Sequence, residues 1–228
     1  MNHESINLKN ILYIAYQFPP LNVGGAARPG KFAKYFKQTG INPIVITLDP
    51  ADYEKVYAGA KKDSNILDYK NCDFKILNVP SRHLLRNSGE GFRKYLEIFF
   101  SIYGSREKKY WEKSYHTIVD NYLVSNKVDA VLVTAPPFGM LPLAAKTAKR
   151  YNLPLLIDMR DAWTMWNVTP FTNYFNFLRT KFEERNVFAF AQKIIVTSKV
   201  TIEDFKMLHP TVKPDKFEYI PNGFEFDL

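Results

Sequence analysis

The sequence of 228 residues contains one cysteine, Cys72. A single cysteine excludes an internal disulfide and any metal site built on several cysteines. No run reaches the ~18 to 20 apolar residues that a membrane-spanning helix requires. The first nine residues are polar and do not form a charged-then-apolar leader. We therefore expect a protein of the reducing cytosol that does not cross a bilayer.

Low-complexity segments and an excess of acidic residues are also lacking. Hydrophobic residues make up 46% of the chain and charged residues 24%, which is typical of a globular protein. The net charge of +8 predicts attraction to an anion, which composition alone leaves open: nucleic acid, a phospholipid surface or a phosphorylated substrate. Because the basic residues are spread over several expected helices without a recognised motif, nucleic acid is not an expected partner.

Short apolar runs alternate with helical patterns along the chain. A strand at 10–16 is followed by a glycine turn, a helix at 26–39 that Gly40 would end, and a second strand at 43–49. The later elements are expected as strands at 74–79, 130–134, 155–158, 193–197 and 217–220, and helices at 139–151, 174–191 and 198–208. This order predicts an α/β fold: a single Rossmann-like doubly wound domain with about seven mostly parallel strands and helices on both faces. No linker or repeat divides residues 1–228.

Residues 82–126 are rich in both basic and aromatic side chains. One interpretation is a crossover of two amphipathic helices, whose aromatic residues pack on the sheet while lysines reach the solvent. The other is a membrane-surface patch, since Lys and Arg beside Trp, Phe and Tyr are typical of interfacial helices.

A glycine bend, Gly24–Gly25, follows the first strand and opens the first helix. Glycine allows backbone N–H groups to approach a ligand, and a helix N-terminus favours negative charge, so the bend predicts a phosphate cradle. Arg28 and Lys31, one turn apart on the helix, favour the same ligand. The spacing differs from the dinucleotide fingerprint G-x-G-x-x-G, and a simple tight turn is the alternative.

Two further loops follow expected strands, at 134–139 and 158–163. Ligands of open α/β sheets bind at the carboxyl ends of the strands, so both loops should border the same crevice as the glycine bend. The first loop contains two prolines and offers Pro136 and Phe138 as wall residues, although it could also be a structural turn. In the second loop, Asp158 and Asp161 flank a single guanidinium, so that a carboxylate could orient a sugar hydroxyl or serve only in a structural salt bridge.

Near the C-terminus, residues 220–224 read Ile-Pro-Asn-Gly-Phe. Asn-Gly after a short strand is typical of a turn, and this one predicts a hinge at a domain joint.

Four segments in this order resemble the N-terminal domain of glycosyltransferase family 4, whose members have two facing Rossmann-like domains, the GT-B fold. They are YQFPPLNVGGAARPGKFAKYF at 16–36, IDMRDAWT at 157–164, VTSKVTIEDF at 196–205 and YIPNGFEFD at 219–227. The resemblance spans the whole chain. Many family members carry a histidine after the fourth strand, where this chain has Ala135-Pro136-Pro137, so that role has no counterpart here.

The resemblance implies retaining transfer of a hexosyl unit from a nucleotide-diphosphate sugar to a saccharide or lipid-linked acceptor in polysaccharide synthesis, with no metal and no other cofactor. It implies that Gly24 and Gly25 contact the donor phosphates, and it suggests Asp161 as the catalytic candidate. The residues expected at the acceptor are Arg28, Lys31, Pro136, Phe138, Asp158, Arg160 and Trp163. The chain would then be the N-terminal half of the GT-B architecture, inactive without a C-terminal donor-binding domain. A peripheral position on the inner face of the cell membrane fits such acceptors.

Two other functions are open to the same fold. A nicotinamide-dependent oxidoreductase would need the fingerprint glycines, which are missing. A non-catalytic module that binds an anionic membrane surface would account for the net charge and for the aromatic residues of 82–126.

Overall fold

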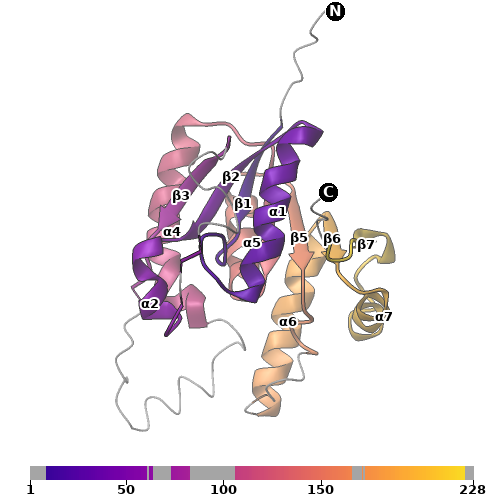
Figure 1. The fold of residues 1–228 in the computed structure, drawn as a ribbon. Helices are drawn as coiled ribbons and strands as arrows, with labels where there is room; N and C mark the ends of the chain where they lie inside the picture. Colours follow the sequence, from indigo (N-terminus) through magenta and orange to yellow (C-terminus); the bar gives the residue numbers. More distant parts are fainter. Residues whose placement is uncertain are drawn as a thin grey trace, which may run out of the picture.

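The computed structural model describes residues 9–60, 62–63, 73–82, 106–165, 171 and 173–223. These residues form one seven-stranded sheet in the order β3-β2-β1-β4-β5-β6-β7, and each neighbouring pair is parallel (Figure 1). The strands are β1 (Lys9–Ile14), β2 (Ile41–Leu48), β3 (Lys75–Val79), β4 (Ala130–Ala135), β5 (Leu155–Met159), β6 (Lys193–Val196) and β7 (Phe217–Tyr219). The predicted Rossmann-like α/β fold is confirmed.

The strand order reverses between β1 and β4. The chain passes from β1 to β2 and β3 on one side, and then returns to β4 on the other side of β1 before continuing to β7. The loops that leave β1 and β4 consequently diverge to opposite faces of the sheet. In open α/β sheets the crevice for a ligand forms at such a point, beyond the carboxyl ends of the strands.

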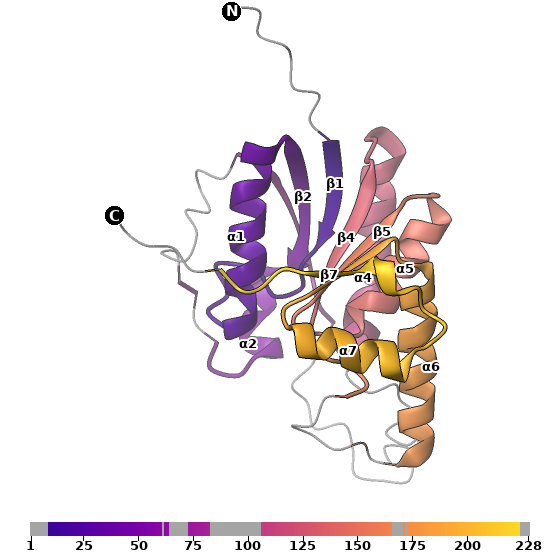
Figure 2. The ribbon, with the colours of Figure 1, turned by 90° about the vertical axis from the view of Figure 1, so that its right-hand side faces the viewer.

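Helices cover both faces of the sheet. They are α1 (Ala27–Phe36), α2 (Tyr53–Val56), α4 (Arg106–Ser125), α5 (Met140–Arg150), α6 (Tyr174–Phe190) and α7 (Lys199–Leu208), with 3₁₀ turns at Gly24–Ala26, Lys37–Thr39, Pro50–Asp52 and Pro214–Lys216. Figures 1 and 2 show α1 on one face and α4 and α5 on the other. The central strands are therefore buried on both sides, which is why they read as continuous apolar runs in the sequence.

The side chains of β1, which point alternately to the two faces of the sheet, illustrate this burial on both sides. Leu12 and Ile14 belong to the large cluster under α4 and α5, whereas Ile11 and Tyr13 belong to the cluster under α1. The expected helix end at Gly40 is present, since its φ of 76° is a left-handed conformation that glycine adopts without strain.

The aromatic residues of α4 pack into the core. Trp111 and Tyr115 are fully buried; the indole Nε1 of Trp111 donates to the Val79 carbonyl at 3.0 Å, and the Tyr115 hydroxyl lies 3.0 Å from Thr147 Oγ1. Lys113 on the same helix is exposed. For α4, the amphipathic-packing interpretation is confirmed, and its buried aromatic residues are not available to a membrane surface. The preceding part of that prediction, residues 83–105, lies outside the described residues. Among the helices that the structure describes, none is long and apolar enough to cross a membrane.

Candidate functional site

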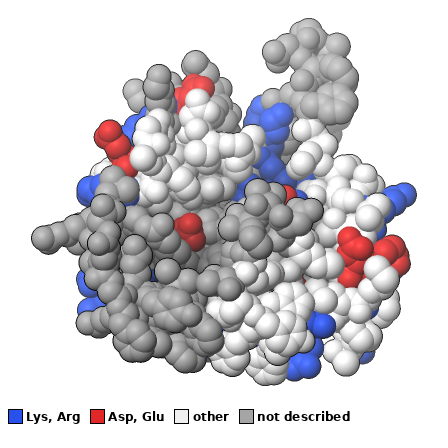
Figure 3. Space-filling model, turned by 90° about the horizontal axis from the view of Figure 1, so that it is seen from below, with Lys and Arg blue, Asp and Glu red and all other residues white. Residues whose placement is uncertain are grey.

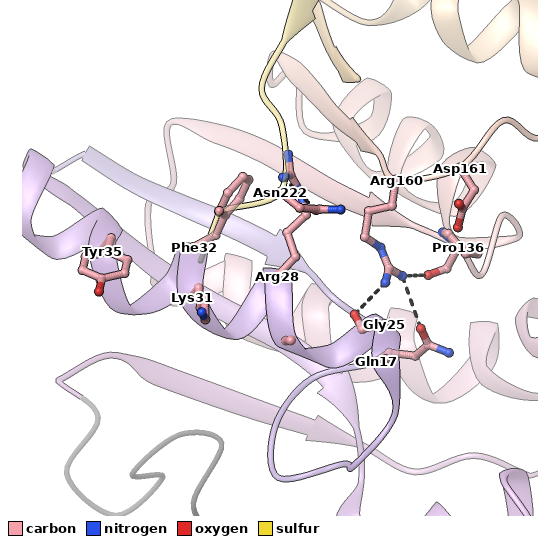
Figure 4. Close-up of a pocket in the computed structure, with 13 residues that line it drawn as sticks. Gln17, Gly25, Arg28, Lys31, Phe32, Tyr35, Pro136, Arg160, Asp161 and Asn222 are labelled. Atoms are coloured by element: carbon pink, nitrogen blue, oxygen red, sulfur yellow. Dashed lines mark hydrogen bonds between the residues drawn. The ribbon is translucent and has the colours of Figure 1, made fainter. Parts of the chain in front are cut away.

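A pocket of about 610 Å³ lies at the carboxyl edge of the sheet (Figure 4). The loops after β1, β4, β5 and β7 contribute to its wall, together with one side of α1. The lining residues are Gln17, Gly24, Gly25, Ala27, Arg28, Lys31, Phe32, Tyr35, Pro136, Arg160, Asp161, Asn222 and Gly223. The structure thus brings together seven of the ten sequence-predicted site residues, from segments separated by up to 137 positions (from Gly24 to Asp161).

Two backbone donors of the glycine bend are unpaired in the wall of this pocket. The Ala26 N–H donates to the Val23 carbonyl at 2.9 Å, but the N–H groups of Gly24 and Gly25 have no acceptor within the described part of the chain. They stand at the start of a 3₁₀ turn that leads into α1, where backbone N–H groups are unpaired and the helix dipole is positive. This geometry suits an anionic oxygen.

Gly25 is a glycine because side chains approach it closely. A Cβ atom at this position would overlap the amide oxygen of Gln17 and lie 2.5 Å from Nη1 of Arg160. At Gly24, by contrast, a Cβ would meet nothing within 4 Å. The two glycines of the bend therefore have different roles: Gly25 makes room for Arg160, and Gly24 leaves the bend open to the pocket.

Arg160 has no carboxylate partner among the described residues. Its guanidinium donates instead to three neutral oxygens: the Gly25 carbonyl at 2.7 Å, Gln17 Oε1 at 3.2 Å and the Pro136 carbonyl. Its Nε is buried without a partner. Burial lowers the pKa of Arg160, against the opposing charges of Asp158 and Asp161, yet an arginine stays charged at neutral pH. A positive charge that no carboxylate of the described residues contacts directly therefore lies in the pocket wall, although Asp158 and Asp161 act on it through space.

Asp161 is the only acidic residue that the described part of the chain contributes to the pocket wall. Its carboxyl is half-buried, and burial raises its pKa while the neighbouring Arg160 charge lowers it. The catalytic candidate therefore lies at the edge of the pocket beside a guanidinium, in a place where it can contact a ligand.

Arg28 also lines the pocket, but its donors are already used by the protein. Nε and Nη2 bind Asp158 at 2.9 to 3.2 Å, Nη2 also binds the Ile220 carbonyl at 3.0 Å, and Nη1 binds the Pro221 carbonyl at 2.9 Å and Asn222 Oδ1 at 3.2 Å. All five N–H groups of the guanidinium are thereby satisfied. The guanidinium of Arg28 thereby ties α1 to β5 and to the segment after β7, and the expected contact of Arg28 with an acceptor stays a prediction.

Asp158 is fully buried beneath the pocket and does not line it. Its carboxylate accepts from Arg28 and from the hydroxyl of Thr134 at 2.9 Å. The sequence suggested pairing among Asp158, Arg160 and Asp161, but the Asp158 carboxylate contacts the guanidinium of Arg28 on α1 instead. The expected acceptor contact of Asp158 is therefore corrected.

The acceptor contacts expected of Phe138 and Trp163 are also corrected, because both side chains are buried and neither lines the pocket. They are 4% and 0% exposed, and their rings stack on each other at 5.7 Å between centroids. The contact joins the loop after β4 to the loop after β5 behind the pocket wall. Both residues support the wall and neither reaches the cavity.

The loop that carries Asp161 is held in place by a buried pair of side chains, Glu184 on α6 and His209 at the end of α7. Glu184 and His209 are inaccessible to solvent and lie 2.8 Å apart, and the second carboxylate oxygen of Glu184 accepts from the Thr164 backbone N–H at 3.2 Å. The loop is also fixed at Arg160, whose N–H donates to the Ala135 carbonyl at 2.9 Å. The position of Asp161 thus depends on several elements.

Sequence reasoning missed part of the wall: Gln17, Ala27, Phe32, Tyr35, Asn222 and Gly223. Phe32 and Tyr35 lie four and seven residues after Arg28, so they share one side of α1, and this spacing could have found them. Gln17 directly follows the buried strand. Asn222 was predicted only as part of a hinge.

The surface around the strand ends carries no single basic patch among the described residues. Lys and Arg side chains occur there in separate groups among uncharged surface (Figure 3). Within the described ranges, no three His, Cys, Asp or Glu side chains come together in a group that could hold a metal ion. Metal-free chemistry and the lack of a nucleic-acid partner stay predictions.

The strand order and the position of the pocket define the class of the protein as a Rossmann-like α/β domain. No family model matches the chain, and no curated protein matches its sequence. Among solved structures, it is similar to sucrose-phosphate synthase from Thermosynechococcus elongatus, with a TM-score of 0.56 and 12% identity over 95% of this chain and 48% of that one. The chain spans about half the length of this neighbour. At such identity the likeness shows the fold, which is shared with a GT-B glycosyltransferase.

Proposed function

We propose that this chain is the N-terminal, acceptor-side half of a retaining glycosyltransferase of the family 4 type. It would transfer a hexosyl unit from a nucleotide-diphosphate sugar to a saccharide or lipid-linked acceptor in polysaccharide synthesis. The observation that carries the proposal is the convergence, in one pocket, of the unpaired N–H groups of Gly24 and Gly25 with the charge of Arg160, whose hydrogen bonds go to neutral oxygens. Together they complement a diphosphate.

Arg160 is assigned in this proposal to the donor phosphates. It was expected at the acceptor, but its Nη1 lies 2.7 Å from the Gly25 carbonyl, so its charge is next to the glycine bend. Lys31 and Pro136 line the same pocket and are left for the acceptor. No metal is invoked, since the guanidinium and the helix N-terminus supply positive charge on this side of the diphosphate.

Asp161 is proposed as the residue nearest the transferred sugar. Sugar transfer passes through a transition state in which positive charge develops on the sugar ring, and a carboxylate nearby stabilises that charge. Its half-buried position beside Arg160 makes the interaction stronger than it would be in water. The rigid support of its loop by Glu184 and Trp163 holds the carboxylate in a fixed position.

Two measurements test the proposal on the purified chain. Inorganic pyrophosphate, titrated by isothermal calorimetry, should bind at a single site, and an excess of sodium chloride at the same ionic strength should give no such heat. Lack of any pyrophosphate binding would contradict the proposed site.

A sugar-transfer assay of residues 1–228 should give no turnover, because closure of two domains around the substrates is needed. Turnover with any nucleotide sugar would refute the proposal that catalysis requires a second, donor-binding domain.

A second candidate function is attachment to a membrane surface, which a feature of α6 favours. Tyr174, Phe175, Leu178 and Phe182 are each more than 40% exposed on this helix, with Lys181 and Arg185 beside them. Exposed aromatic residues next to cations are typical of interfacial helices. This surface could serve a lipid-linked acceptor or a non-catalytic membrane module.

Sedimentation with vesicles tests this second function. The chain should partition into vesicles that contain anionic lipid more than into zwitterionic ones, and Phe182→Ser should reduce the bound fraction. Val124→Ser, at an exposed site on α4, is the matched control. Equal partitioning into both kinds of vesicle would remove the electrostatic argument.

A further inference from the structure

Asn222 lies in the pocket wall, in the segment of residues 220–223 that follows β7 and runs back toward α1 (Figures 2 and 4). Its side-chain oxygen accepts from Arg28 Nη1 at 3.2 Å. Because arginine can only donate, the amide oxygen must be the atom that faces Arg28. The amide Nδ2 of Asn222 consequently points away from Arg28, and it has no acceptor within the described residues. The orientation of this amide is therefore fixed by its neighbour.

Arg28 is itself held by a chain of buried contacts. Asp158 binds the guanidinium through both carboxylate oxygens, and the hydroxyl of Thr134 donates to Asp158. The ring of Phe32 lies under the guanidinium carbon at 4.4 Å. Since β4, β5 and α1 all contribute, the guanidinium has one position, and so does the amide that it orients.

The electrostatics of the pocket indicate what Nδ2 would bind. Among the described residues, the wall carries the charge of Arg160, the ammonium of Lys31 and the N–H groups of the glycine bend, against one carboxylate, that of Asp161. Because the charge that this wall offers to a ligand is mainly positive, an anionic oxygen is the complementary ligand atom.

We propose that Asn222 is a ligand-binding residue that donates from Nδ2 to a phosphate oxygen, and that Arg28 is the positioning residue that orients it. The inference rests on the proposed function and deepens it. The Asn-Gly turn expected to act as a hinge would then also form one wall of the binding site. Because Arg28 also holds the carbonyls of Ile220 and Pro221, a bound diphosphate and the segment of residues 220–223 would be coupled through one side chain.

Pyrophosphate titration of side-chain variants tests this role. Asn222→Ala removes the donor and should weaken pyrophosphate binding about ten-fold, as expected for a hydrogen bond to a charged group. Asn222→Asp keeps an oxygen for Arg28 but places a second negative charge in the pocket, so it should bind still more weakly while unfolding at the same or a higher temperature than the wild type. Asn121→Ala, at an exposed position on α4, is the matched control and should bind as the wild type does.

The positioning role of Arg28 is tested by a double-mutant cycle. Arg28→Lys keeps the charge but loses the fork that orients Asn222, so it should weaken binding by about as much as Asn222→Ala. If Arg28 acts through Asn222, the double variant should bind no more weakly than Asn222→Ala alone. Additive losses would overturn the positioning role. If Arg28→Lys does not fold, the pair Asn222→Ala and Asn222→Asp decides the assignment of Asn222.

The outcomes separate this inference from the proposed function. Wild-type affinity in both Asn222 variants, with binding abolished by Arg160→Ala, would overturn the role of Asn222 and leave the diphosphate site standing. Failure of the wild-type chain to bind pyrophosphate would overturn both. Ten-fold losses in the Asn222 variants, with none in Asn121→Ala, would support both.

Discussion

Two arginines lie within the same pocket wall and differ in what surrounds them. Arg28 has a buried carboxylate partner and all of its donors are occupied, whereas Arg160 has only neutral oxygens and a buried Nε without a partner. The first region is closed and joins three parts of the chain; the second is open toward the cavity. The comparison teaches that a charge in a pocket wall indicates a ligand only when the protein itself does not neutralise it.

The largest effect on stability is expected from removing the carboxylate that pairs with Arg28. Asp158→Asn leaves the guanidinium of Arg28 buried without its counter-charge, so the free energy of unfolding should fall by about 3 to 5 kcal/mol. Urea unfolding followed by circular dichroism measures it. Asp215→Asn, at an exposed carboxylate, is the control and should change stability by less than about 0.5 kcal/mol. A loss for Asp158→Asn as small as that of the control would mean that the two regions do not differ as described.

Substitution of Arg160 should change the affinity for pyrophosphate much more than it changes the stability of the fold. Arg160→Ala should weaken pyrophosphate binding ten-fold or more, because it removes a charge that has no ion-pair partner among the described residues, and should lower the free energy of unfolding by only about 1 kcal/mol. Lys113→Ala removes the same charge from an exposed site on α4 and controls for long-range electrostatics. Equal effects of the two variants on affinity would show that net charge, and not the position of Arg160, governs binding.

The two glycines of the bend sharpen the comparison further. Gly25→Ala should displace the ends of Gln17 and Arg160 and weaken pyrophosphate binding several-fold, at little cost in stability because both atoms end flexible side chains. Gly24→Ala meets nothing within 4 Å and should leave stability near that of the wild type. Calorimetry and thermal unfolding on both variants check this, and a Gly25→Ala variant with unchanged affinity would argue against the position of Arg160.

The smallest effect concerns the pH dependence at Asp161. Burial raises the pKa of this carboxyl, so the folded state binds its proton more tightly than the unfolded state and stability falls as the pH rises through the range between the two pKa values. Asp161→Asn should therefore be slightly more stable than the wild type at neutral pH. Denaturant unfolding at several pH values should show this advantage vanish below the ordinary carboxyl range. A variant that is less stable at neutral pH would mean that the carboxylate has a partner.

The fold was predictable because burial on both faces of a parallel sheet leaves a strong local signal. All seven strands lie within two residues of their predicted ends, and Gly40 ends the first helix unit as expected. The short helix α2 was not predicted, since it has only four residues and directly follows the 3₁₀ turn Pro50–Asp52. The candidate site was predictable as a set of loops, because strand ends of a parallel sheet meet at one edge.

The roles of single side chains could not be predicted in the same way. Asp158 lies two residues from Arg160 but pairs with Arg28, which is 130 positions away. Phe138 and Trp163 were assigned to the cavity from their place in the loops, and both pack against each other instead. Contacts of this kind depend on the direction of each side chain across the sheet.

The sequence by itself determined the α/β class, the parallel strands and the edge at which a ligand pocket forms, because these follow from local periodicity and from the chain order of strands and helices. Only the tertiary structure decided which charges are neutralised and which face the pocket. Neutralisation depends on atoms a few ångströms apart in space, and in this protein those atoms come from residues more than a hundred positions apart in the chain.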